Sequence, residues 1–395
     1  DLRVMSPTSY RTAPPRGVHW TLLPPQPSFN SSQLHWKGLA LQSSPVNARP
    51  VSNQLPPAPM PSRGRVPLWH LLAFAFMAAS FISGCSFGED SDAPAPKLPL
   101  PPETNIAYGP DLGCTDANGS PTGAPASDCG GAQQLDIYRS PQPGPNPVLL
   151  WFHGGGFVAG DKSGDVSAYL EAALKDGWDI LAVDYRLTTI AGENEFPTAI
   201  QDAKRSVRWV KANAEEQDWD PNNVAALGES AGGNIAAMLA ASTNEADLEP
   251  TNLPAELFGS ATAPIDSAVI ASIALIPVTD LTLFAQNDVW GDLVNRYIGC
   301  SSNSKLCEAG YQLGSVQTHV TPQSQPLLSL HGINDPLAAP QQGVLLREAY
   351  SAAGIPERFR QVVVSDGPER YQGHEVDYKR FVGDFVEFFN AARTT

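Results

Sequence analysis

The sequence predicts an α/β protein built on a doubly wound, mostly parallel sheet. Apolar stretches of strand length alternate with stretches of helical spacing across residues 105–395, the pattern of strands joined by crossover helices. Several strand stretches are apolar on both faces, as strands covered by helices on both sides are. These observations favour a single large domain, and the sequence contains no internal repeat.

Local composition places the elements. Strands are expected where apolar residues run together between turn-forming residues: 135–140, 147–154, 179–187, 223–229, 268–278, 326–333 and 359–365. A helix is expected over 197–216, because Pro197 suits a first helical turn and apolar residues recur on one face from Ile200 to Val210. Further helices are expected over 231–242, 340–353 and 376–392.

The segment 281–325, between two expected strands, has a helical pattern of its own. Its apolar residues recur at helical spacing: Trp290, Leu293, Val294, Tyr297 and Ile298. We interpret this segment as one short lid-like insertion.

The first part of the chain does not have the composition of a folded domain. Residues 1–59 are rich in Pro, Ser and Gln without periodic apolar spacing, which predicts a disordered or untranslated extension. Residues 60–84 begin with Met60 and two arginines and continue into an apolar run, which is the layout of a secretory signal. Residues 85–104 read as a Pro-rich acidic tether, and 105–395 as the folded α/β domain.

The end of this signal segment suggests lipid attachment. Its last residues, Ile82-Ser83-Gly84-Cys85, resemble a bacterial lipoprotein lipobox, which implies translation from Met60, a lipid on Cys85 and export to the periplasm or outer surface. A short membrane-anchor helix is the alternative, although its apolar run is marginal against the roughly 20 residues that span a bilayer.

Charge excludes some partners. The chain carries a formal charge of −16, but residues 1–84 contain seven Lys and Arg against Asp1 alone. From Cys85 onward, 18 basic residues face 40 acidic ones, a formal charge of −22. So acidic a surface repels nucleic acid and anionic lipid headgroups and favours neutral or cationic ligands.

Cysteine usage agrees with an oxidising compartment. If Cys85 is lipidated, an even four cysteines remain: Cys114, Cys129, Cys300 and Cys307. Three pairings are possible, and we favour sequence neighbours because each would close a loop rich in Gly, Ser, Asn and Asp. Buried free thiols are the alternative.

A serine among small residues is the first chemical signal. The pentapeptide Gly228-Glu229-Ser230-Ala231-Gly232 would occur by chance in about one chain in ten of this length. Here it joins an expected strand to an expected helix, the context in which a sharp turn exposes a nucleophilic hydroxyl. Ser230 is therefore a candidate nucleophile.

A glycine motif supplies candidate partners for that serine. The stretch WFHGGGFVAGDKSG follows an apolar strand, and its backbone amides could approach a substrate oxygen closely. We predict an oxyanion hole from the amides of Gly155, Gly156 and Ala231. A flexible loop without function is the alternative.

Together these motifs resemble a known family. The stretches HGGGFVAGDK, DYRL, FPTAIQDAKRSVRWVKANAEEQDWDPNNVAALGESAGGNIAAMLAAS and HGINDPLAAP resemble the α/β-hydrolase carboxylesterases of the hormone-sensitive-lipase-like and feruloyl-esterase-like (BD-FAE) type, over about residues 132–392. The resemblance implies an α/β-hydrolase fold and a serine esterase that forms an acyl-enzyme. It also implies the chain order serine, acid, histidine.

That order assigns the remaining catalytic residues. The family places its acid shortly after a His-Gly pair at a strand end, which corresponds to Asp335, with Asp280 as a rival. Of the histidines that follow Cys85, His153 belongs to the glycine motif, and among His319, His331 and His374 only His374 follows Asp335. Asp335 could instead form a turn and His374 could be an exposed helix-entry residue. The approach to His374, SDGPERYQGH, departs from the family pattern because it is charged.

Other chemistries lack sequence support. No His or Cys cluster has metal-ligand spacing, and phosphate-loop and dinucleotide fingerprints are absent, so we expect neither metal nor cofactor. The expected ligand is a small-molecule ester with a short acyl or aryl group, because one short flap cannot bury a long chain. An amidase or peptidase on the same triad is the first alternative and a non-catalytic surface binding protein the second; the oligomeric state is left open.

Overall fold

The computed structural model describes residues 102–110, 133–163, 167–243, 245–260, 264–285, 291–300, 305–365 and 373–393. All of them belong to one compact unit. The expected extension, the signal segment, Cys85 and nearly all of the tether lie outside the described residues, as do Cys114, Cys129 and Trp290.

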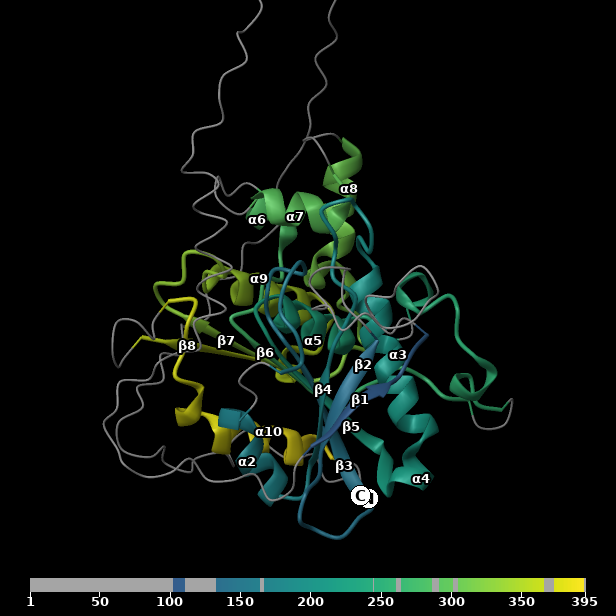
Figure 1. Ribbon diagram of the computed structural model, residues 1–395. Coiled ribbons are helices and arrows are strands. Elements are labelled where there is room, and N and C mark those ends of the chain that lie inside the picture. Colours follow the sequence, from purple (N-terminus) through teal and green to yellow (C-terminus); the bar gives the residue numbers. More distant parts are fainter. Residues whose placement is uncertain are drawn as a thin grey trace, which may run out of the picture. The chain divides into compact units, whose positions relative to one another are not determined.

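The described chain is organised around an eight-stranded sheet (Figure 1). Its strands are β1 (Glu103–Ala107), β2 (Gln134–Tyr138), β3 (Asn146–Phe152), β4 (Asp179–Val183), β5 (Trp219–Glu229), β6 (Ser272–Leu275), β7 (Leu327–Gly332) and β8 (Phe359–Val364). They lie in the order β1-β2-β4-β3-β5-β6-β7-β8. The pairs β1/β2 and β2/β4 are antiparallel and the other pairs are parallel, which confirms the mostly parallel sheet.

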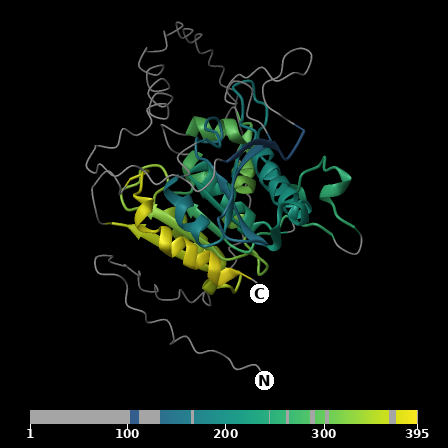
Figure 2. The ribbon, with the colours of Figure 1, turned by 60° about the horizontal axis from the view of Figure 1, so that its bottom comes forward.

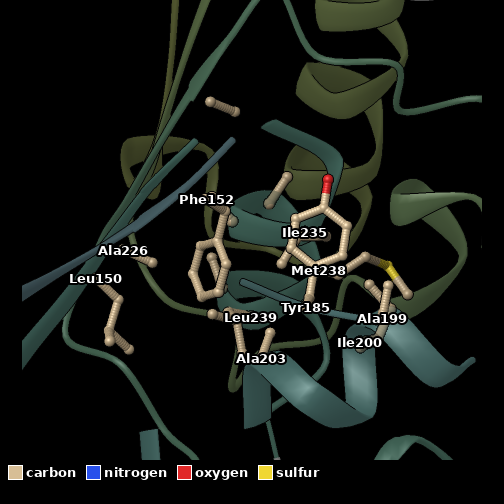
Figure 3. Close-up of a cluster of buried hydrophobic side chains, with 14 of the residues drawn as sticks. Leu150, Phe152, Tyr185, Ala199, Ile200, Ala203, Ala226, Ile235, Met238 and Leu239 are labelled. Atoms are coloured by element: carbon tan, nitrogen blue, oxygen red, sulfur yellow. The ribbon is translucent and has the colours of Figure 1, made fainter. Parts of the chain in front are cut away.

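Helices cover both faces of the sheet (Figures 1 and 2). On one face lie α3 (Thr198–Ala212), α5 (Ala231–Ala241) and α9 (Gln341–Ala352); on the other lie α2 (Ser167–Lys175) and α10 (Val382–Ala392). Alternate residues of a strand point to opposite faces, so each strand feeds both cores. In Figure 3, Leu150 and Phe152 of β3 gather with Ile235 and Leu239 of α5 in the first of these cores.

Several elements differ from the sequence prediction. β1 includes Glu103, within the expected tether, and it was missed because its side chains are mostly exposed at the sheet edge. Helix α2 was also missed. The expected helix 197–216 divides into α3 and α4 (Ala214–Gln217), and the expected helix 376–392 starts only at Val382, after a 3₁₀ turn at Tyr378–Arg380. The strand expected over 268–278 is only four residues long, and Ile276 beyond it has a positive φ of 41°.

The insertion is larger than one helical flap. It contains α6 (Leu281–Ala285), α7 (Gly291–Ile298) and α8 (Lys305–Gly314), followed by a 3₁₀ turn at Val316–His319. These three helices pack against one another, at the top of the view in Figure 1. Cys300 and Cys307 form the expected disulfide, with their Cα atoms 5.5 Å apart, and it links the end of α7 to α8.

The other short elements are 3₁₀ turns at Ala246–Leu248, Ala255–Leu257 and Pro356–Arg358. Among the described residues, every helix is too short or too polar to cross a bilayer.

Candidate active site

Ser230 lies in a sharp turn between β5 and α5. Its φ of 54° and ψ of −113° are unusual for a residue with a side chain, and its amide donates to the Leu275 carbonyl at 2.8 Å. The neighbouring glycines are required by space. A Cβ on Gly228 would lie 2.1 Å from the Gly232 carbonyl oxygen, and one on Gly232 would lie 2.1 Å from the Phe152 carbonyl oxygen. The small residues therefore allow α5 to begin against the end of β3.

Two other predicted residues lie beside this serine. His374 Nε2 is 3.0 Å from Ser230 Oγ, and His374 Nδ1 is 2.9 Å from Asp335 Oδ2. Asp335 follows β7, whereas His374 follows β8 at the edge of the sheet. Parallel strands end at the same side of a sheet, so three distant segments meet there.

The environment of Asp335 favours the charged carboxylate. Its other oxygen, Oδ1, accepts hydrogen bonds from the amides of Leu337 and Ala338 at 2.8 and 2.9 Å. Burial by itself would raise the pKa of Asp335, but the hydrogen bond and charge of His374 together with these amides outweigh burial and hold the pKa below its usual range. Asp335 can therefore remain ionised beside a histidine near neutral pH.

The glycine motif lies against the serine turn. Gly155 and Gly156 have φ values of 117° and 61°, which favour glycine, and a Cβ on Gly154 would lie 3.4 Å from Ser230 Cβ. Among the described residues, the amides of Gly155 and Gly156 donate no backbone hydrogen bond outside the helices and strands. Gly155 and Gly156 thus follow directly on a residue that lies against Ser230, and Ala231 is next to it in the chain; their role as oxyanion donors stays a prediction.

The rival residues have other partners. His319 contacts Glu245 at 2.6 Å and the Leu313 carbonyl at 2.6 Å. Asp280 accepts hydrogen bonds from the amides of Thr282 and Leu283, so it caps the start of α6.

The side chain of His153 contacts the backbone of the glycine motif. Its ring stacks on Tyr185 with centroids 4.4 Å apart, and the Tyr185 hydroxyl donates to the His153 carbonyl at 2.9 Å. Burial lowers the pKa of His153 to about 4, so the ring is neutral at pH 7 and can donate from Nδ1 to the Gly154 carbonyl at 2.7 Å.

His331 has a supporting position that the sequence did not suggest. Its Nδ1 contacts the Ala338 carbonyl at 3.0 Å, and its Nε2 can accept from Ser329 Oγ at 2.5 Å. Burial lowers the pKa of His331 to about 4, so it is neutral at pH 7. The ring ties β7 to Ala338, whose amide binds Asp335. Its place in the His-Gly pair before Asp335 was the only available signal.

Helix α7 of the insertion packs on the glycine motif. A Cβ on Gly156 would lie 3.1 Å from Leu293 Cδ1, so Leu293 lies over the predicted oxyanion loop. Phe157 stacks on Tyr297, whose hydroxyl is buried without a hydrogen-bond partner. The predicted helical spacing identified both α7 residues, but it could not show their contact with residues 156–157.

A metal centre has no support in the part of the chain that the structure describes, where no group of three or more His, Cys, Asp or Glu side chains is placed to hold an ion.

Sequence comparison places this geometry in a family. Residues 135–350 match the BD-FAE family, which is more than half of the 395 residues. The chain belongs to the BD-FAE family. The matched range contains Ser230, Asp335 and the glycine motif, whereas His374 lies beyond its end.

Relatives of this BD-FAE protein include named esterases. It is 30% identical to "Probable carboxylic ester hydrolase LipM" of Mycobacterium tuberculosis over 67% of this chain and 56% of LipM. It is 42% identical to "Esterase LipI" of the same organism over 24% of this chain and 28% of LipI. The BD-FAE chain thus spans little more than half of the first relative's length and less of the second.

Among solved structures, the chain resembles a truncated carbohydrate esterase from gut microbiota. That likeness has a TM-score of 0.58 and 22% identity and covers 76% of this chain and 98% of the other. At this identity the likeness shows the fold alone, which is the α/β-hydrolase fold.

Proposed function

We propose that the chain is a serine carboxylesterase that hydrolyses small carboxylic esters through an acyl-enzyme. The observation that carries the proposal is the continuous hydrogen-bonded series from Ser230 Oγ through His374 to the buried Asp335 carboxylate. A serine hydroxyl is a weak nucleophile at neutral pH, and an imidazole within 3.0 Å can accept its proton. The names of the curated relatives support ester rather than amide substrates.

The proposed first half-reaction joins the serine to the acyl group. Ser230 Oγ attacks the ester carbonyl carbon while its proton moves to His374 Nε2. The amides of Gly155, Gly156 and Ala231 stabilise the resulting oxyanion. The carbonyl re-forms, the alkoxide leaves and takes the proton from His374, and the acyl group remains on Ser230.

In the second half-reaction, water takes the place of the alcohol. His374 accepts a proton from water, the hydroxide adds to the acyl carbonyl, and Ser230 leaves with the proton returned by His374. Asp335 stabilises the imidazolium formed in each half and fixes which ring nitrogen carries the proton. The net reaction consumes one ester and one water and releases an acid and an alcohol.

The proposed substrates carry short acyl or aryl groups. Leu293 lies close above Gly156, which limits the space over the oxyanion loop. Burying each methylene gains roughly 0.8 kcal/mol only where an apolar wall receives it, and Leu293 leaves little room for such a wall. We therefore expect kcat/KM for p-nitrophenyl esters to be highest for short acyl chains; a maximum at about ten carbons or longer would contradict this.

Covalent labelling tests the nucleophile directly. A fluorophosphonate probe should label Ser230, and Ser230→Ala should lower kcat by at least about 10³-fold. His374→Ala should cost a similar factor, because the members of a triad act as a unit. Thr282→Ala, which changes a hydroxyl that bonds to the rival Asp280, is the control and should retain activity. Labelling at another serine, or an active Ser230→Ala enzyme, would refute the assignment.

A panel of p-nitrophenyl esters and matched p-nitroanilides then separates ester from amide hydrolysis. Faster cleavage of the anilides would favour the amidase alternative.

We also propose that the protein is exported as a lipoprotein that begins at a lipidated Cys85. The charge pattern of residues 60–84 and the Cys300–Cys307 disulfide both support an oxidising compartment. Mass spectrometry of the mature N-terminus should find a diacylglyceryl group on Cys85, and unreduced peptide maps should find Cys114 paired with Cys129. A mature chain that still carries Arg63 would contradict this proposal.

A further inference from the structure

A cavity of about 680 Å³ lies beside α3, and its walls include Tyr108, Arg205, Trp209 and Leu257. Helix α3 follows β4 and leads into β5, so it runs from the carboxyl side of the sheet back to the amino side. Trp209 lies near the end of α3, toward the amino ends of the strands, whereas Ser230 follows β5 at the carboxyl ends. The cavity is therefore separate from the candidate active site, and its volume is that of a small-molecule site.

Arg205, one of the residues that line the cavity, is a buried cation with unpaired donors. Arg205 is only 4% exposed, and its Nη2 donates to the Asn252 carbonyl. Its Nε and Nη1 are buried and have no hydrogen-bond partner. Buried guanidinium groups are normally paired, because removing a charge and its donors from water is costly.

The carboxylate whose charge acts on Arg205 already has hydrogen-bond partners. Asp202 is fully buried and accepts hydrogen bonds from Arg186 Nε and Nη2, from the Arg186 amide and from Gln133. Burial lowers the pKa of Arg205 and the charge of Asp202 opposes this, so Asp202 acts on Arg205 through space without bonding to it. The Asp202 carboxylate thus influences two guanidinium groups, but only that of Arg186 donates hydrogen bonds to it.

The rest of the cavity indicates what kind of anion would fit. Trp209, Leu253 and Leu257 give it apolar walls, which inorganic phosphate would leave uncovered. Glu256 is exposed at the wall and disfavours multiply charged anions. We propose that this cavity binds a small organic monocarboxylate, with the carboxylate at Arg205 and an apolar ring or chain against Trp209.

Benzoate and benzamide test the proposal, because they share a ring and differ in charge. With the full-length protein labelled on tryptophan indole nitrogen, benzoate should shift the Trp209 signal, assigned from its loss in Trp209→Phe. Benzamide and inorganic phosphate should each need at least about 10-fold higher concentration, since hydrogen bonds to charged groups are the stronger ones. Equal binding of benzamide or of phosphate would overturn the carboxylate assignment, and an unmoved Trp209 signal would overturn the site.

Two variants locate the anion. Arg205→Gln should weaken benzoate binding at least about 10-fold and leave benzamide unchanged. Should this buried change prevent folding, the exposed Glu256→Gln remains: it should tighten benzoate binding about 2-fold to 5-fold at low salt without affecting benzamide. Unchanged benzoate affinity in Glu256→Gln would contradict an anion in this cavity. Because the signal is read at Trp209, the result does not depend on whether Ser230 is a nucleophile.

Discussion

Phe157 and Tyr297 stack face to face, with ring centroids 3.7 Å apart and planes within 5° of parallel. Phe157 directly follows Gly156 and has a left-handed φ of 65°, which is costly for a residue with a side chain. Tyr297 belongs to α7, and its carbonyl also accepts from the Phe196 amide at 2.7 Å. The insertion therefore helps to hold the backbone conformation of the predicted oxyanion loop.

This stack predicts opposite effects of two substitutions at Tyr297. Tyr297→Phe should leave the free energy of unfolding unchanged or raise it by up to about 1 kcal/mol, since it removes a buried hydroxyl that has no partner. Tyr297→Ala should lower it by about 3 to 5 kcal/mol and reduce kcat, because Phe157 loses its support. Urea unfolding and steady-state kinetics measure both. A marked loss of stability in Tyr297→Phe would show that the hydroxyl has a role that the structure does not reveal.

Asp335→Asn should reduce kcat by about 10³-fold to 10⁴-fold, because an amide cannot stabilise the imidazolium of His374.

The depressed pKa of Asp335 also predicts a stability effect. Its carboxylate stabilises the fold above its ordinary pKa near 4, and this contribution is lost as the pH falls through the lower pKa of the folded state. The variant should therefore lose stability less steeply below pH 4 in acid unfolding. If the parent and Asp335→Asn lose stability equally steeply below pH 4, the pKa argument is contradicted, whereas the prediction for kcat still stands.

Leu293→Ala should shift acyl preference toward longer chains, because it clears space directly above Gly156. The expected change is an increase of about 3-fold to 10-fold in the ratio of kcat/KM for hexanoate over acetate, at roughly 0.8 kcal/mol per methylene accommodated. Leu313→Ala on α8 is the matched control, since that side chain is 57% exposed. A similar shift in both variants would argue against a specific role for Leu293.

Removal of the Cys300–Cys307 bond should destabilise the fold by roughly 2 to 3 kcal/mol, as expected for a short loop. Thermal melts of the Cys300→Ser, Cys307→Ser double variant test this against the parent protein. A reductant should then lower the Tm of the parent more than that of the variant. Equal shifts in Tm would mean that the reductant acts on stability through another part of the chain.

Buried neutral histidines predict a stability loss in mild acid. The pKa values of His153 and His331 are lowered by burial to about 4, so the unfolded chain binds more protons below pH 6.5. Stability should therefore fall as the pH drops from 6.5 to 4. Asp184 opposes this below pH 6, because burial raises its pKa to about 6.

The variant His331→Gln isolates one of these histidines. Urea unfolding at several pH values should give a slope between pH 6 and 4.5 that is smaller than that of the parent by about 1 kcal/mol per pH unit. Identical slopes would mean that His331 is protonated in the folded protein.

The sequence predicted the elements whose patterns are local and strong. Strand β3 has a continuous apolar pattern because both of its faces are buried. Helix α3 has a clear apolar period because one broad face is buried. β1 could not be predicted in this way, since an edge strand is defined by its pairing with β2 and its own side chains are largely exposed. The insertion helices were underestimated because α6 is only five residues long and the prediction rested on the apolar spacing of residues 290–298 alone.

The candidate site shows the same division. Ser230 and the glycine motif were found from short motifs, and Asp335 and His374 from chain order within a resembled family; the structure then brings these side chains within hydrogen-bonding distance. The roles of His331 and Tyr297 depend on contacts between distant segments, which no local pattern encodes.

The position of His374 beyond the edge strand β8 also sets a time order during synthesis. Ser230 emerges from the ribosome 144 residues before His374, which at typical elongation rates is a delay of roughly 7 to 30 s. Throughout that interval, the nascent chain contains the serine turn and the glycine loop but lacks His374, the base proposed to activate Ser230. On the proposed mechanism, a growing chain would acquire esterase activity only when its last strand joins the sheet.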